Sequence, residues 1–110
     1  MTHREATKLV HGKTNRMERK VANNTYARIE QNGDVVFRLH STDIVTIHPD
    51  NTATIQTGGW HSHTTKARIN KYLPDGSYLY QENWKWFLSD IQNCEGRPFE
   101  EGMLVMGVAG

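Results

Sequence analysis

TYARIEQNGDVVFRLH, residues 25–40, has the period of two that is typical of β-strands on both sides of a central Asn-Gly pair. Asn32-Gly33 is a strong hairpin signal because both residues tolerate positive φ. In the second half, Val35, Phe37 and Leu39 share one face of the expected strand. The stretch therefore predicts an antiparallel hairpin with one buried face.

The next residues extend this hairpin into a meander. Ser41-Thr42-Asp43 is typical of a turn or bulged corner, and a strand is expected over residues 43–48. Pro49-Asp50-Asn51 turns the chain again, and residues 52–57 return as a further strand. The Thr, Val and Ile content favours strands. We therefore expect a four-stranded antiparallel meander.

A helix is expected after the meander, over residues 66–73. Thr64 or Thr65 can act as its N-cap, and Pro74-Asp75-Gly76 ends it. Ile69 and Leu73 would face the sheet, whereas the polar positions would be mostly outward, namely Lys66, Arg68, Asn70 and Lys71.

The last third predicts a second hairpin, rich in aromatic residues. Its strands are residues 78–81 and 84–88, on either side of Glu82-Asn83. In that register Tyr78 and Tyr80 share a face, as do Trp84 and Trp86, and residues 103–106 suggest an edge strand. The predicted fold class is α+β, mostly antiparallel β: a meander sheet, one short helix and a C-terminal aromatic hairpin, with closure into a small barrel or sandwich left open.

Length and charge limit the organisation of the chain. Its 110 residues fit one domain, and the net charge of +1 gives no global attraction to nucleic acid or an anionic membrane. Residues 1–20 carry six basic side chains against Glu5 and Glu18. We expect a flexible basic N-terminal arm over residues 1–20, either solvated or in contact with phosphates, and a single β-rich domain over residues 21–110.

The chain lacks the sequence features of an exported or membrane-spanning protein. No apolar run is long enough to span a bilayer, and the N-terminus lacks the apolar stretch of a signal peptide. Cys94 is the only cysteine, so no internal disulfide can form. We expect no membrane association and a cytoplasmic location, unless the protein is carried in a particle.

Several segments resemble, in order, a family of small proteins encoded by bacteriophages. They are RLHSTDIVT at 38–46, PDN at 49–51, GGW at 58–60 and TTKARIN at 64–70. The aromatic hairpin and residues 99–103 are similar to the end of the same pattern, so the resemblance covers about four fifths of the chain. It implies a phage or prophage origin, and hence the host cytoplasm or the virion as location. It implies no reaction.

The corner that precedes the helix is the first candidate site. Gly58-Gly59 ahead of a helix N-terminus can expose backbone N–H groups to an anion, and Trp60 offers a stacking face. Further donors would come from Thr64, Thr65, Lys66, Arg68 and Lys71. The alternative is a capped helix docked on a sheet, with Trp60 in the core.

Histidines form the second candidate, as a weak metal site. His61 and His63 would project to one side of an extended segment, and His40, His48, Asp43 or Asp50 could add ligands. The strong Cys/His spacings are absent, so we expect scattered surface histidines, no metal and no cofactor.

Catalysis has little support from the sequence. Cys94 lies beside Glu95, whose carboxylate would not favour a thiolate nucleophile. Asp43 is near His40 and His48 in the sequence, but no catalytic signature motif surrounds this possible dyad.

The aromatic hairpin is the third candidate, as a docking surface. Tyr78, Tyr80, Trp84 and Trp86 are of the types that dominate protein–protein hot spots, although one face of the hairpin would complete a core.

The favoured function is a non-enzymatic phage accessory protein that binds a host or phage protein, for example as an inhibitor of host defence. Nucleic acid, through the basic arm and the helix start, and self-association remain further possibilities for its partner. The alternatives are a minor virion protein and a nucleotide- or anion-binding protein that uses the Gly58-Gly59 corner.

Overall fold

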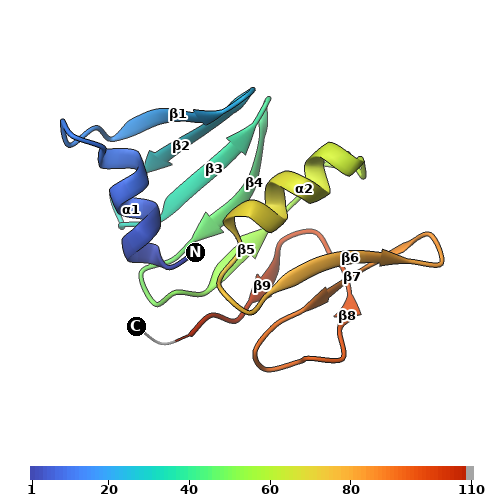
Figure 1. The fold of residues 1–110 in the computed structure, drawn as a ribbon. Helices are drawn as coiled ribbons and strands as arrows, with labels where there is room; N and C mark the ends of the chain where they lie inside the picture. Colours follow the sequence, from blue (N-terminus) through green and yellow to red (C-terminus); the bar gives the residue numbers. More distant parts are fainter. Residues whose placement is uncertain (109–110) are drawn as a thin grey trace.

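A six-stranded antiparallel sheet forms the larger part of the molecule (Figure 1). The computed structural model describes residues 1–108, so the last two residues of the domain expected over 21–110 lie outside it. The strand order is β1-β2-β3-β4-β5-β9. The bounds are β1 Glu18–Ala22, β2 Thr25–Ile29, β3 Val35–Leu39, β4 Thr42–Ile47, β5 Ala53–Ile55 and β9 Met103–Val105.

The meander expected from the sequence is confirmed as β2-β3-β4-β5. Its register aligns Ala27 with Phe37, Phe37 with Val45, and Val45 with Ile55. All four side chains are fully buried. This row of aligned apolar residues explains why the register is fixed, since a slip by one residue would move each of them to the other face.

The N-terminal segment differs from the flexible arm that we expected. Residues His3–His11 form helix α1, and β1 adds a strand to the sheet. The Thr2 side chain accepts from the Glu5 N–H and Glu5 bonds back to Thr2, which is a capping box. Ala6 and Val10, four residues apart, are fully buried against the sheet. The capping sequence and this apolar pair explain why the basic segment packs on the sheet.

Helix α2, His63–Tyr72, is the helix expected from the sequence, and it begins earlier than predicted. Ser62 is the N-cap, because its side chain accepts from the Thr65 N–H. Tyr72 stacks on Phe37 with ring centroids 4.0 Å apart, which fixes the helix against the middle of the sheet. Both helices lie on one face of the six-stranded sheet (Figure 1). None of the helices within residues 1–108 is long and apolar enough to cross a membrane.

A second sheet packs on the other side of α2. Its strands are β6 Tyr78–Glu82, β7 Lys85–Ser89 and β8 Arg97–Pro98, in that order and antiparallel. Leu79, Trp86 and Leu88 belong to the same core as the larger sheet. The structure therefore has two separate sheets with α2 between them (Figure 1), and within residues 1–108 they do not close into a barrel.

Asn70 joins α2 to the second sheet, although we expected it to point outward. Its Nδ2 donates to the Leu79 carbonyl at 2.8 Å, and its Oδ1 accepts from the Leu79 N–H at 2.7 Å. These are backbone groups on the edge of β6 that does not face β7. The amide therefore satisfies part of an open strand edge, which would otherwise be free to pair with another chain.

The tip of the second hairpin also differs from the prediction. The register pairs Glu82 with Lys85, so the two-residue turn is Asn83-Trp84. Asn83 and Trp84 have φ values of +50° and +68°, the combination of signs found in type I′ turns. Trp84 is therefore in the turn, and it does not share a strand face with Trp86.

Candidate functional site

The Gly58-Gly59 corner follows β5, and its backbone donors already hold a carboxylate from the same chain. The Thr57 and Gly58 N–H groups each lie 3.0 Å from Glu101 Oε2. The buried Thr57 hydroxyl donates to Glu101 Oε1 at 2.5 Å. The sequence analysis considered the backbone N–H groups of this corner as a site for an external anion, whereas in the structure the Thr57 and Gly58 N–H groups bond to the carboxylate of Glu101.

The expected cationic residues of α2 each contact a different part of the molecule. Lys66 Nζ lies over the Trp86 ring, 5.9 Å from its centroid, and Lys71 Nζ lies 5.7 Å from the centroid of Tyr72. Arg68 donates through Nε to Thr25 Oγ1 at 3.2 Å, at the start of β2. The three side chains thus do not converge, and the corner lacks the set of donors that we expected for an anion.

A pocket of about 420 Å³ opens between the β3–β4 turn and the start of α2. Trp60, Thr64 and Thr65, three of the expected site residues, line it. Leu39 and Ile44 supply a buried apolar surface. The other lining residues are His40, Ser41, Thr42, Thr57 and Ser62. The lining residues, all within the described part of the chain, include no Lys, Arg, Asp or Glu.

The sequence did not predict that the β3–β4 turn belongs to this site. Gly58 brings the two segments together, since a Cβ at this position would lie 2.8 Å from Thr42 Oγ1. Its φ of +61° also favours glycine. The glycine pair was therefore a usable signal of close backbone approach, but nothing local in the sequence shows which segment approaches it.

The histidines that we considered as metal ligands are dispersed. His61 stacks on Trp86 with centroids 4.7 Å apart, and its Nε2 is 4.0 Å from Glu101 Oε1. His63 is exposed in the first turn of α2. Within residues 1–108, no group of three or more His, Cys, Asp or Glu side chains is arranged to hold a metal ion.

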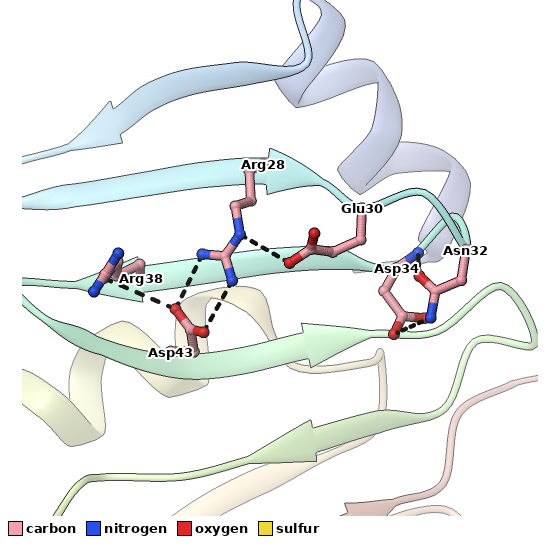
Figure 2. Close-up of polar contacts among 6 residues, drawn as sticks. All are labelled: Arg28, Glu30, Asn32, Asp34, Arg38 and Asp43. Carbon is pink, nitrogen blue, oxygen red and sulfur yellow. Dashed lines mark hydrogen bonds and ion pairs between the residues drawn. The ribbon is translucent and has the colours of Figure 1, made fainter.

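Asp43 is not paired with a histidine. It accepts two hydrogen bonds from Arg28, at 2.9 and 3.1 Å, on the face of the sheet turned away from the helices (Figure 2). These hydrogen bonds hold the pKa of Asp43 below its ordinary value. His48 bonds instead to Asp34 and Thr54. The Asp–His dyad considered from the sequence is therefore absent at this position.

The second hairpin presents aromatic side chains on the side opposite α2. Tyr80 stacks on Tyr78, with centroids 6.2 Å apart, and on Phe87 at 5.7 Å. Pro98 of β8 is aligned with Phe87, so it continues the row on this side. We call Tyr78, Tyr80, Phe87 and Pro98, together with Trp84 at the tip, the aromatic face. Trp86 points to the other side and is buried.

Comparison with known proteins places the chain in a phage family. Residues 3–106 match the family model described as Kyanoviridae Gp96 protein. Comparison with curated proteins and with solved structures gives no match. The match runs from α1 to the end of the last strand, which confirms the phage-encoded family suggested by the sequence segments. The chain therefore belongs to the Kyanoviridae Gp96 protein family.

Proposed function

We propose that this phage protein is a non-enzymatic accessory factor that docks on a host protein through its aromatic face. The observation that carries the proposal is Trp84, which is 93% exposed at a φ of +68°. A non-glycine residue in this conformation costs about 1 kcal/mol. A large apolar side chain in water contributes nothing to offset that cost, so folding alone does not account for Trp84.

The surroundings of Trp84 favour a protein partner. Tyr78 is 58% exposed, and Tyr80 and Phe87 are half-buried beside it. Tyrosine and tryptophan are enriched at the centres of protein interfaces, because they bury a large area at a small cost in side-chain entropy. The aromatic face therefore offers an anchor at the tip and a flat apolar row behind it.

Charge argues against nucleic acid as the partner of this face. Lys85 at the tip lies opposite Glu82, and Glu95 lies near Tyr80, whose hydroxyl donates to the Glu95 carbonyl. Binding of a phosphate backbone requires several Lys or Arg side chains along the path of the strand. The aromatic face lacks such a series among its described neighbours. A host protein in the cytoplasm, such as a component of a defence system, remains the proposed partner.

The alternative of a virion role depended on a flexible basic arm that links neighbouring subunits. Residues 3–11 are instead helix α1, with Ala6 and Val10 buried against the sheet. The Met1 amino group also bonds to Asp75 at 2.8 Å. These contacts favour the aromatic face over the N-terminus as the surface that binds a partner.

The test compares capture of host proteins by the tagged protein and by two variants in infected cells. Trp84→Gly removes the indole from a turn that suits glycine, so the variant is expected to fold. Tyr26→Ala is the matched control, because Tyr26 is 44% exposed on the larger sheet, away from the hairpin. We expect one host protein, resistant to nuclease, with the parent and Tyr26→Ala and at least tenfold less of it with Trp84→Gly.

Purified partner and protein must then reproduce the same order of affinities. Equal recovery by the parent and Trp84→Gly would contradict the proposal. Recovery of nuclease-sensitive material alone would indicate nucleic-acid binding, and recovery of phage structural proteins alone would indicate the virion role. Each of these results would replace the proposed function.

A further inference from the structure

The pocket beside the Gly58 corner has the chemistry of a small-molecule site separate from the aromatic face. At about 420 Å³ it falls in the lower part of the size range of ligand pockets. Two turns and a helix start converge on it, and Trp60 at its rim is 69% exposed. A solvent-facing indole beside an apolar surface provides a stacking position that the fold itself does not use.

Several polar groups in the pocket have no partner within the chain. Thr57 is engaged by Glu101, and the Ser62 and Thr65 hydroxyls bond to each other. In contrast, the side chains of His40, Ser41, Thr42 and Thr64 make no hydrogen bond among the described residues 1–108. Hydroxyls both donate and accept, and imidazole does so at its two nitrogens. These groups form a rim that can match a ligand edge carrying both donors and acceptors.

Within the described residues, the pocket offers no charged side chain as a partner for a charged ligand. The residues lining it within the described chain include no Lys, Arg, Asp or Glu. The nearby backbone N–H groups of Thr57 and Gly58 already hold the Glu101 carboxylate. A phosphate in the pocket would have only the start of α2, and no cationic side chain in the described lining, to compensate for its desolvation, which favours a neutral ligand. A neutral ligand therefore fits this lining better than an anion.

The apolar surface of the pocket favours one of two classes of neutral ligand, a sugar or a planar heterocycle. A sugar needs polar partners around most of its ring, whereas Leu39 and Ile44 offer none through their side chains. A planar heterocycle has two apolar faces and a polar edge, so it can lie against such a surface, stack on Trp60 and meet the hydroxyl rim. We infer that the pocket binds a neutral planar heterocycle with a hydrogen-bonding edge, such as a nucleoside base.

The test is titration of the full chain with adenosine and uridine, followed by ¹H–¹⁵N correlation spectra. We expect saturable shifts at the backbone amides of residues 40–42 and 57–65 for at least one nucleoside, with a Kd of about 1 mM or below, the range of a small neutral ligand. Trp60→Ala, which removes an exposed side chain, should weaken binding at least tenfold. Trp84→Ala, on the hairpin tip, should leave the Kd unchanged.

Other ligands make the test decisive. Methyl glucoside and inorganic phosphate serve as probes for a sugar and for an anion. Saturation by methyl glucoside alone, or by phosphate or AMP without adenosine or uridine, would overturn the inference. It would also be overturned if neither nucleoside shifted these amides at 10-fold the expected Kd (about 10 mM), or if Trp60→Ala bound as tightly as the parent.

Discussion

The two hairpins of this protein, β2–β3 and β6–β7, differ in the residue that occupies the position of positive φ in their turns. The first turns through the three-residue loop Gln31-Asn32-Gly33, in which the Gly33 N–H donates to the Glu30 carbonyl and Gly33 has a φ of +91°. The second turns through Asn83-Trp84, with a tryptophan at a position that also has positive φ. Glycine at the last position of such a three-residue loop is the residue that its positive φ prefers. The second departs from that preference, and residues that break a local rule tend to be functional.

The two hairpins also differ in what holds them. The β2–β3 hairpin contributes Ala27 and Phe37 to the buried row across the larger sheet. The β6–β7 hairpin has Leu79 and Leu88 in the core, while polar contacts from Asn70 and Asp90 hold its edge and its end. Because these polar and apolar contacts secure the second hairpin from its edge, from its end and from the side of α2, Tyr78 and Trp84 of its aromatic face remain exposed.

The largest expected difference between the two hairpins is in the free energy of unfolding that each loses when its phenylalanine is replaced by alanine. Phe37→Ala should lower the free energy of unfolding by about 4 kcal/mol, because it removes a fully buried ring that stacks on Tyr72. Phe87→Ala should lower it by about 1 kcal/mol, since this ring is half-buried on the aromatic face. Urea unfolding followed by circular dichroism measures both values. Equal losses would show that the aromatic face belongs to the core.

An intermediate effect is expected at Asp90, which follows β7. This buried carboxylate accepts from the backbone N–H groups of Gln92, Asn93 and Met106, and from Arg97. Burial by itself raises the pKa of Asp90, but these donors together outweigh it and lower the pKa below its ordinary value. Asp90→Asn should therefore lower the free energy of unfolding at pH 7 by about 2 kcal/mol.

The pH dependence gives the control for Asp90. A carboxyl group whose pKa is lower in the folded state stabilises the fold above its unfolded pKa, and the contribution is lost as the pH falls through the folded pKa. The difference in stability between the parent and Asp90→Asn should thus be constant near pH 7 and shrink below about pH 4. A difference that stays the same down to pH 2 would contradict this role of the charged form.

Much of the fold could be predicted from the sequence, because its turns and strands depend on local sequence signals. The Asn32-Gly33 turn, the alternation in β3 and the start of α2 near Thr64 are all local patterns. Helix α1 was missed although Thr2 and Glu5 have the spacing of a capping box, because few apolar residues follow them. The basic charge of the segment then suggested an arm.

The site was less predictable because its parts are distant in the sequence. Glu101 fills the corner at Gly58 from 43 residues away. The β3–β4 turn reaches the same region through Thr42, and α2 directs Lys66 towards Trp86. No periodicity encodes such contacts. The residue types at the corner were informative about its chemistry, whereas the partners depended on the packing of the two sheets around α2.

The smallest expected effects are on the free energy of unfolding when a residue of either turn is replaced, and they have opposite signs at the two turns. Gly33→Ala should lower the free energy of unfolding by about 1 kcal/mol, because alanine is strained at positive φ and its Cβ would lie 3.3 Å from Pro49 Cγ. Trp84→Gly should raise it by up to about 1 kcal/mol, because glycine relieves the same strain and the exposed indole loses no contact within the fold. Thermal unfolding of both variants beside the parent measures the two shifts.

This change of sign separates a structural turn from a functional one. If Trp84 were retained for folding, Trp84→Gly would destabilise the hairpin as Gly33→Ala destabilises the first one. A variant that is as stable as the parent or more so, and that no longer captures the partner, would show that the tryptophan is maintained at a cost in stability for binding. Loss of both stability and binding would instead place Trp84 among the residues that hold the hairpin together, and the anchor of the aromatic face would then have to be sought at Tyr78.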